Sequence, residues 1–252
     1  ERIASYMEDA LPVSLRERWD HDGVMLLPAA EQAVTGVLCA LDATTVAIAE
    51  ARRRGANLLV THHPLLFDPL EALDARDGVG TRVLACVRAG IAVLSYHTRL
   101  DNAPGGVNDC LCRMLGLEDA APCAPCVHLG VLPEEMRFAD FRDWVCRRLS
   151  IPYAEGVEST GRVRRLAVVA GGGKDYVRAA KDCGADTFLT GEANHAAMIE
   201  ARELGLNLLC ATHYATENVA VERLGRLLEE GFPELRGRVA LLPFERVREY
   251  GI

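Results

Sequence analysis

The chain has 252 residues, half of them hydrophobic, with a formal net charge of -8 and a pI of about 5.4. This length suits one large domain or two small lobes, and the apolar share allows a sizeable core. The acidic balance disfavours general binding to nucleic acid, and no apolar run reaches the roughly 20 residues that span a bilayer. No signal peptide is visible, so we expect a cytoplasmic protein.

Short apolar runs alternate along the chain with helix-like stretches, which predicts an α/β fold with largely parallel strands covered on both faces. The first half gives strands at 34–41, 57–61 and 91–96, with helices at 44–54 and 81–89 between them. The second half gives strands at 127–132, 164–170, 186–190, 207–212 and 238–243, with helices at 138–149, 175–183, 193–204 and 217–230.

The sequence contains an internal repeat. Residues 36–61 align without gaps on residues 165–190, and each copy reads strand, loop, helix, Gly-Ala, strand, threonine. Chance is the alternative, because short βαβ segments resemble one another. We predict two similar, interlocked α/β lobes with mostly parallel or mixed sheets, 1–126 and 127–252, without an inserted domain.

The repeat extends into the next strands. There His97 aligns with His213 and Asp101 with Glu217, so each half ends a strand with a histidine followed four residues later by a carboxylate. In parallel α/β sheets ligands bind beyond the carboxyl ends of the strands. The pattern predicts a shared cleft lined by these side chains, although Glu217 alone could serve only as a favourable charge at a helix start.

Two adjacent histidines, His62 and His63, directly follow an apolar strand, and Pro64 disfavours a helix at this point. Neighbouring side chains of an extended chain alternate sides, so the pair can address two ions or two faces of one cleft. A pair of surface or capping histidines is the alternative.

Imidazoles and carboxylates together form the ligand set of zinc, iron, manganese, cobalt or nickel. We therefore predict two divalent metal ions, held by His62, His63, Asp101, His213 and Glu217. Five such ligands do not saturate two six-coordinate ions. Open positions would admit water and substrate, which indicates catalysis, with a water made acidic by the metal as the nucleophile.

Further groups receive weaker assignments. Glu192 aligns opposite His63, and Glu192 and His195 could transfer protons or support the ligands. Residues 171–174, Gly-Gly-Gly-Lys, lie between a strand and a helix, where backbone amides could contact a phosphate; a plain turn is the alternative.

The nine cysteines are expected to be reduced thiols that pack as small hydrophobic side chains, as in cytosolic proteins. A zinc site at Cys110, Cys112, Cys123 and Cys126 is the alternative. It is disfavoured because the first two, two residues apart on a predicted helix, point in divergent directions.

Several blocks, THHPLLF, SYHTRLDNAPGGVND, TGEANH and ATHYATEN, resemble the signature blocks of the Nif-three-like family, also called the GTP cyclohydrolase I type 2 homolog or YbgI family. The N-terminal WDHDGVM resembles the entry block of that family, and the match extends from about Trp19 to Phe244. The resemblance implies a dinuclear metal centre between two α/β lobes, with the five ligands named above.

The resemblance also implies that His97 lies beside the metals and that the chain assembles into a ring-shaped homohexamer. Two blocks depart from the family pattern. Asn102 and Pro104 stand where small residues are common, and His195 is a single histidine where many members have two. The roles of His97, Glu192 and His195 as catalytic residues are therefore predictions that require a test.

The function predicted first is metal-dependent hydrolysis of a nucleotide or other phosphate-bearing small molecule, without a membrane partner. A non-enzymatic role in metal storage or delivery, or as a regulatory binding ring, would use the same ligands without turnover. A scaffold with a vestigial site is the third reading, and the complete ligand set argues against it.

Overall fold

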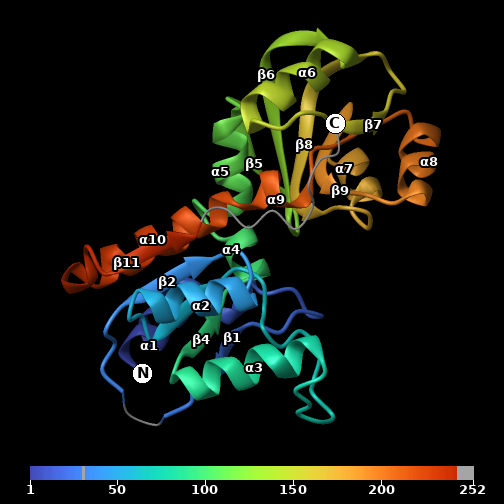
Figure 1. Ribbon diagram of the computed structural model, residues 1–252. Helices are drawn as coiled ribbons and strands as arrows, with labels where there is room; N and C mark the ends of the chain where they lie inside the picture. The colour runs from blue at the N-terminus through green and yellow to red at the C-terminus, as the bar shows by residue number, and fades with distance from the viewer. Residues whose placement is uncertain (30–31, 243–252) are drawn as a thin grey trace. The chain divides into compact units, whose positions relative to one another are not determined.

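The computed structural model describes residues 1–29 and 32–242. The chain divides into two compact units (Figure 1): unit 1 contains residues 1–103 and the described residues from 220 onward, and unit 2 contains residues 104–219. Each unit is a mixed α/β structure with one sheet. None of the helices in the described part of the chain combines the length and apolar character needed to cross a bilayer.

The sheet of unit 1 has the order β1-β4-β3-β2-β11. Strands β11, β2, β3 and β4 are parallel to one another, whereas β1 pairs with β4 in antiparallel fashion. The strands span β1 Gly23–Leu26, β2 Val37–Ala40, β3 Leu58–Thr61, β4 Ala92–Ser95 and β11 Val239–Leu242. The helices span α1 Arg2–Ala10, α2 Thr45–Arg53, α3 Gly78–Ala89, α4 Thr98–Asn102 and α10 Val219–Gly231, with 3-10 turns at Val13–Leu15 and Pro233–Leu235.

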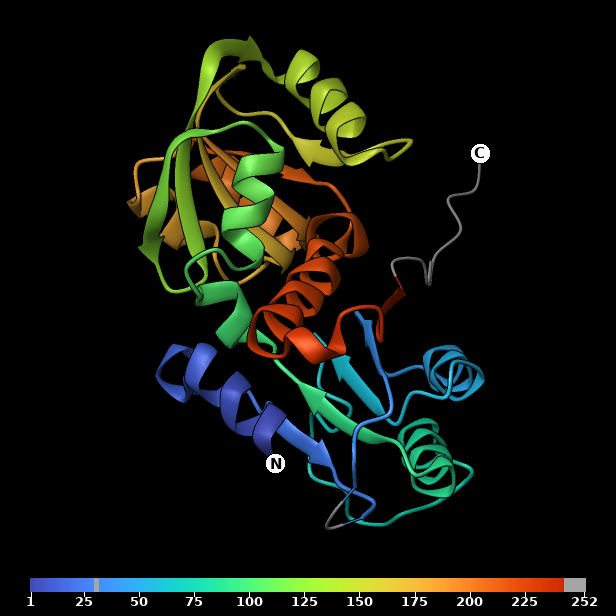
Figure 2. The same ribbon diagram turned by 90° about the vertical axis from the view of Figure 1, so that its left-hand side faces the viewer.

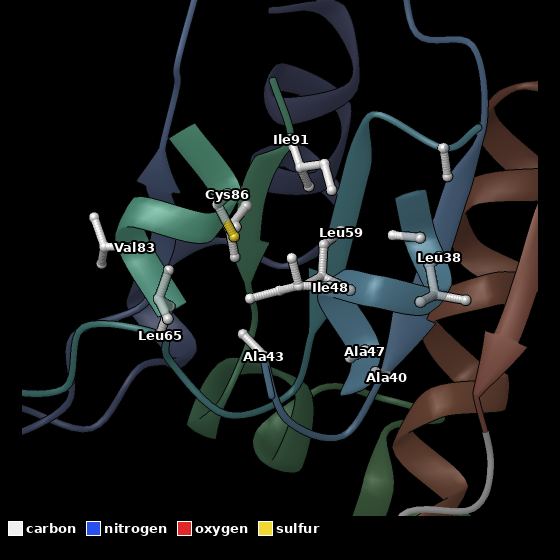
Figure 3. Packing of buried hydrophobic residues seen from close by; sticks show 13 residues of the cluster. Leu38, Ala40, Ala43, Ala47, Ile48, Leu59, Leu65, Val83, Cys86 and Ile91 are labelled. Carbon is white, nitrogen blue, oxygen red and sulfur yellow. The ribbon is translucent and has the colours of Figure 1, made fainter. Parts of the chain in front are cut away.

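Helices α2 and α3 form the core of unit 1 with one face of this sheet (Figure 3). Ile48 of α2 and Cys86 of α3 are buried against Leu38 and Leu59 of the central strands. Both helices begin at capping side chains, because Thr44 and Asp77 accept hydrogen bonds from amides of the first turn. Helices α1 and α10 lie across the sheet from α2 and α3 (Figure 2).

The sheet of unit 2 has the order β5-β6-β8-β9-β10-β7. Strands β8, β9 and β10 are parallel, and the outer strands pair in antiparallel fashion. The strands span β5 Glu118–Ala124, β6 Val127–Arg137, β7 Glu155–Val157, β8 Arg162–Gly172, β9 Thr187–Glu192 and β10 Asn207–Cys210. The helices span α5 Val107–Met114, α6 Phe138–Leu149, α7 Val177–Asp182, α8 His195–Glu203 and α9 His213–Glu217.

The units do not coincide with the predicted lobes, 1–126 and 127–252, and two local interactions explain the difference. Asn108 of α5 donates to the carbonyl of Cys126 and accepts from the amide of Ala170, which fixes α5 to the second sheet. At the other end of the chain, β11 pairs in register with β2 and returns the chain to unit 1. The last predicted strand, 238–243, matches β11, although residue 243 lies outside the described residues.

The predicted repeat is visible in the strand order. Three parallel strands, β2-β3-β4 in unit 1 and β8-β9-β10 in unit 2, are each flanked by an antiparallel edge strand. Thr61 pairs with Ala40 as Thr190 pairs with Val169, which agrees with the ungapped alignment.

At β4 and β10, the structural correspondence between the two units differs by one residue from the alignment of the sequence repeat. Thr61 pairs with Ser95, but Thr190 pairs with Cys210, so the register places Thr212 where His97 lies in unit 1. His97 and Thr212 are accordingly the residues before α4 and α9. The predicted correspondence of His97 with His213, and of Asp101 with Glu217, is therefore displaced by one position in the backbone.

The expectation that all cysteines are reduced is wrong for one pair. Cys123 of β5 and Cys183 at the end of α7 form a disulfide, with Cα atoms 6.0 Å apart. This bond also removes Cys123 from the four-cysteine zinc site considered above. Among the described residues, the groups of side chains able to hold a metal include no cysteine.

A buried histidine outside the candidate site provides a test of pH dependence. His128 of β6 is 2% exposed, with Nε2 3.1 Å from Oδ1 of Asp109. Burial lowers the pKa of His128 below 6.5, and the attraction of Asp109 offsets this only in part. Below pH 6.5 the unfolded histidine therefore binds more protons than the folded one, and its contribution to stability falls as the pH falls.

We expect the stability gap between wild type and His128→Gln to narrow on acidification, by at most about 1.4 kcal/mol per pH unit. The measurement is urea unfolding of both proteins at about pH 7.5 and about pH 5.5. A gap that stays constant or widens would contradict the assigned direction of the pKa shift.

Candidate metal centre

Strand β3 places the two adjacent histidines at the carboxyl end of the sheet of unit 1. The amides of His62 and His63 still donate to the carbonyls of Ala40 and Leu41, so both residues extend the path of the strand. The Thr61 hydroxyl donates to the His63 carbonyl and closes a local turn. His62 is fully buried and His63 is partly exposed, as the alternation of an extended chain requires.

Three histidines are each held through the same ring nitrogen. The Nδ1 atoms of His62, His63 and His97 have hydrogen-bond partners at 2.8–2.9 Å. These partners are the Tyr96 carbonyl for His62, the Asp42 carboxylate for His63 and the Asp20 carboxylate for His97. The other ring nitrogen, Nε2, is then the one that can ligate, which is the usual arrangement of metal-binding histidines.

The same three imidazoles form a compact cluster. Their ring centroids are 5.1–5.6 Å apart, and candidate ligand atoms of His62, His63 and His97 lie within 4.8 Å of one another. Asp101 of α4 is 8% exposed, and its Oδ1 lies 3.6 Å from Nε2 of His62. That separation is too long for a hydrogen bond and suits two donors about 2 Å from one ion, so the donor set fits a divalent metal.

Two buried aspartates behind the cluster were not singled out from the sequence. Asp20 accepts hydrogen bonds from the Thr98 amide and hydroxyl as well as from His97. Burial raises the pKa of Asp20, but the hydrogen bond and charge of His97 together with Thr98 outweigh this and lower it below its usual range. Asp22 accepts from the His97 amide and from the Arg99 guanidinium. The WDHDGVM block carried both residues, and its pair of acids was the available signal.

The second group of polar side chains lies in unit 2. His213 opens α9, with Nε2 2.9 Å from Oε2 of Glu217 and Nδ1 3.4 Å from Oε2 of Glu192. The Glu217 side chain is 4% exposed, whereas those of His213 and Glu192 are 35% and 45% exposed. His195 is exposed in the first turn of α8, and no hydrogen bond between described residues joins it to this group.

Backbone geometry makes room for Glu217. Gly171 has φ +67°, and a Cβ at this position would overlap the Glu217 carboxylate. The Gly171 amide donates to Oγ1 of Thr216, which fixes the loop against α9. Thr212, before α9, also has a positive φ of 67°, a conformation that costs a β-branched residue free energy and that recurs at functional sites. Gly171, which the sequence offered as a phosphate contact, thus accommodates a buried carboxylate.

The predicted site residues therefore fall into two groups. Unit 1 brings together His62, His63, His97 and Asp101. Unit 2 brings together Glu192, His213 and Glu217.

A family model described as Duf34/NIF3 (NGG1p interacting factor 3) matches residues 1–246. A Clostridium perfringens protein named GTP cyclohydrolase 1 type 2 homolog is 31% identical over 226 residues, covering 85% of each chain. The solved structure of Staphylococcus aureus protein SA1388 has a TM-score of 0.88 at 25% identity, covering 99% of this chain and 98% of the other. A Bacillus cereus protein related to NIF3 has a TM-score of 0.90 at 23% identity, covering 99% and 98%, and this likeness concerns the fold alone.

Proposed function

Because this chain belongs to the Duf34/NIF3 family, we propose that it is a dinuclear metal-dependent hydrolase of a nucleotide or other phosphate-bearing small molecule. His62, His63, Asp101, His213 and Glu217 are the proposed ligands of the two ions. The observation that carries the proposal is the orientation of three clustered imidazoles through Nδ1. A cluster that served only packing would not need three such partners.

The substrate class draws support from names and from chemistry. The Clostridium perfringens relative bears the name of a GTP cyclohydrolase homolog, which points to nucleotides. Bound divalent ions supply Lewis acidity toward phosphate oxygens and acidify a water so that it becomes a nucleophile near neutral pH.

Within this proposal His97 transfers a proton from Nε2. Burial lowers the pKa of His97, but the hydrogen bond that its ring donates to Asp20 and the charges of Asp101 and Asp20 outweigh this effect and raise the pKa. The raised pKa favours the protonated ring, so His97 is suited to donate a proton to a leaving group. Glu192 and His195 are also proposed to transfer protons.

The test is turnover of a nucleotide panel by protein loaded with zinc, manganese, iron, cobalt or nickel, with the bound metal measured by elemental analysis. We expect Asp101→Ala and Glu217→Ala to lower turnover by at least about a hundredfold, because each removes a charged ligand. Glu203→Ala, which removes an exposed carboxylate of α8, is the matched control and should leave turnover unchanged. Equal rates in the two ligand variants and wild type would refute metal-dependent hydrolysis.

The same experiment addresses the non-enzymatic alternative. Protein that binds stoichiometric metal, shows no turnover and releases the metal readily to an apo-acceptor would act in storage or delivery. We also propose a cytoplasmic homohexamer. Its mass, measured by light scattering during size-exclusion chromatography, should be six times the 27.4 kDa of the chain.

A further inference from the structure

Two exposed aromatic side chains flank the histidine cluster of unit 1. Trp19 is 51% exposed and Phe67 is 45% exposed, whereas His62 is fully buried. The two rings contact each other, with centroids 6.2 Å apart and planes inclined by 46°. Isolated exposed hydrophobic side chains are common, but a contiguous pair beside polar ligands indicates a binding surface.

His97 connects this aromatic pair to the cluster. Its ring lies edge-on to Trp19, with centroids 5.9 Å apart, and edge-on to Phe67, with centroids 6.3 Å apart. The same ring lies 5.1 Å from that of His62 and 5.6 Å from that of His63. A flat ligand that covered the aromatic pair would therefore have its substituents beside the candidate metal ligands.

We propose that Trp19 and Phe67 form a stacking subsite for a planar heteroaromatic ring of the substrate, of the size of a nucleobase. The assignment rests on the proposed function, because the same molecule would present its phosphate-bearing end to the histidine cluster. About half of each aromatic side chain is open to solvent, and any flat π system can cover such a face. The subsite selects for a ring and not for the hydrogen-bonding pattern of one base.

The chain provides its own fluorescent reporter. It has two tryptophans, and the second, Trp144, lies in unit 2 stacked on Phe141 and beneath the Arg148 guanidinium. Trp144→Phe leaves Trp19 as the only indole. The probes are GMP and ribose 5-phosphate, which share sugar and phosphate and differ in the ring.

In the Trp144→Phe protein we expect GMP to quench Trp19 emission and to bind at least about tenfold more tightly than ribose 5-phosphate. Adding Phe67→Ala should weaken GMP binding about five- to a hundredfold and leave ribose 5-phosphate binding unchanged. Tyr153→Ala is the matched control, because Tyr153 is a 52% exposed aromatic residue of unit 2, and it should change neither affinity.

Equal affinity for the two probes, or an unchanged GMP affinity in the Phe67→Ala variant, would overturn the subsite. Titrations with zinc and with EDTA separate this inference from the proposed function. Ring-dependent quenching in a protein that neither retains metal nor turns over nucleotides would uphold the subsite and remove the hydrolase. Metal-dependent turnover without any preference for GMP over ribose 5-phosphate would uphold the hydrolase and remove the subsite.

Discussion

Replacing Arg99 with methionine is expected to destabilise the protein by about 3–5 kcal/mol. Arg99 is 1% exposed, its Nε lies 2.8 Å from Oδ1 of Asp22, and its Nη1 donates to the Leu11 carbonyl and to Glu8. The Asp22 side chain is completely buried, so the substitution leaves a carboxylate in a low-dielectric environment without its main cation. The measurement is the free energy of unfolding in urea.

Arg16→Met is the matched control. Arg16 also approaches Asp22, but at 3.7 Å and with a side chain that is 32% exposed, so its removal should cost less than about 1 kcal/mol. Adding Asp22→Leu to Arg99→Met should recover part of the loss, because the uncompensated charge is then gone. If Arg99→Met and Arg16→Met had the same free energy of unfolding, the buried Arg99–Asp22 pair would contribute no more to stability than the partly exposed Arg16.

Gly171→Ala is expected to cost roughly 2–4 kcal/mol and to reduce metal binding. The substitution forces a side chain into a left-handed conformation, φ +67°, and against the Glu217 carboxylate. Since the Glu217 side chain is buried and its carboxylate lies against Gly171, the carboxylate has to move. Chemical unfolding and elemental analysis of the purified protein measure the two effects.

The neighbouring Gly172 provides the control. A Cβ at Gly172 would meet no atom within 4 Å, so Gly172→Ala should change neither stability nor metal content appreciably. Full metal content in Gly171→Ala with a normal unfolding free energy would show that the position of Glu217 does not depend on this glycine.

Much of the fold follows from sequence periodicity. Apolar runs such as residues 57–61 and 207–212 mark central strands, because a strand buried on both faces has no polar alternation. The repeat predicted that three strands of one half correspond to three of the other, and these strands have the same parallel order in the two sheets. The unit boundaries did not follow, because they depend on pairing between β2 and β11, strands about 200 residues apart, and on the hydrogen bonds of a single side chain, Asn108.

The candidate site was likewise predictable from the sequence only in part. The residue types of His62, His63 and Asp101 and their place after strands predicted that these side chains belong to a metal site, and the structure brings the three close together. The sequence did not reveal Asp42 as the partner of His63, because hydrogen bonds between separate loops leave no local pattern. The sequence alignment also concealed the one-residue offset at Thr212. It paired His97 with His213 because the residue types agree, whereas the strand registers pair the backbone of His97 with that of Thr212.

The return of the chain through α10 to β11 has a consequence for biosynthesis. Residues 104–219 form a contiguous segment, so this unit can fold as soon as it leaves the ribosome. The sheet of unit 1, although four of its five strands are translated first, lacks β11 until residues 239–242 emerge, and until then β2 presents an open edge to other chains. The second unit is thus completed first, and a stalled or truncated nascent chain is exposed to aggregation at β2.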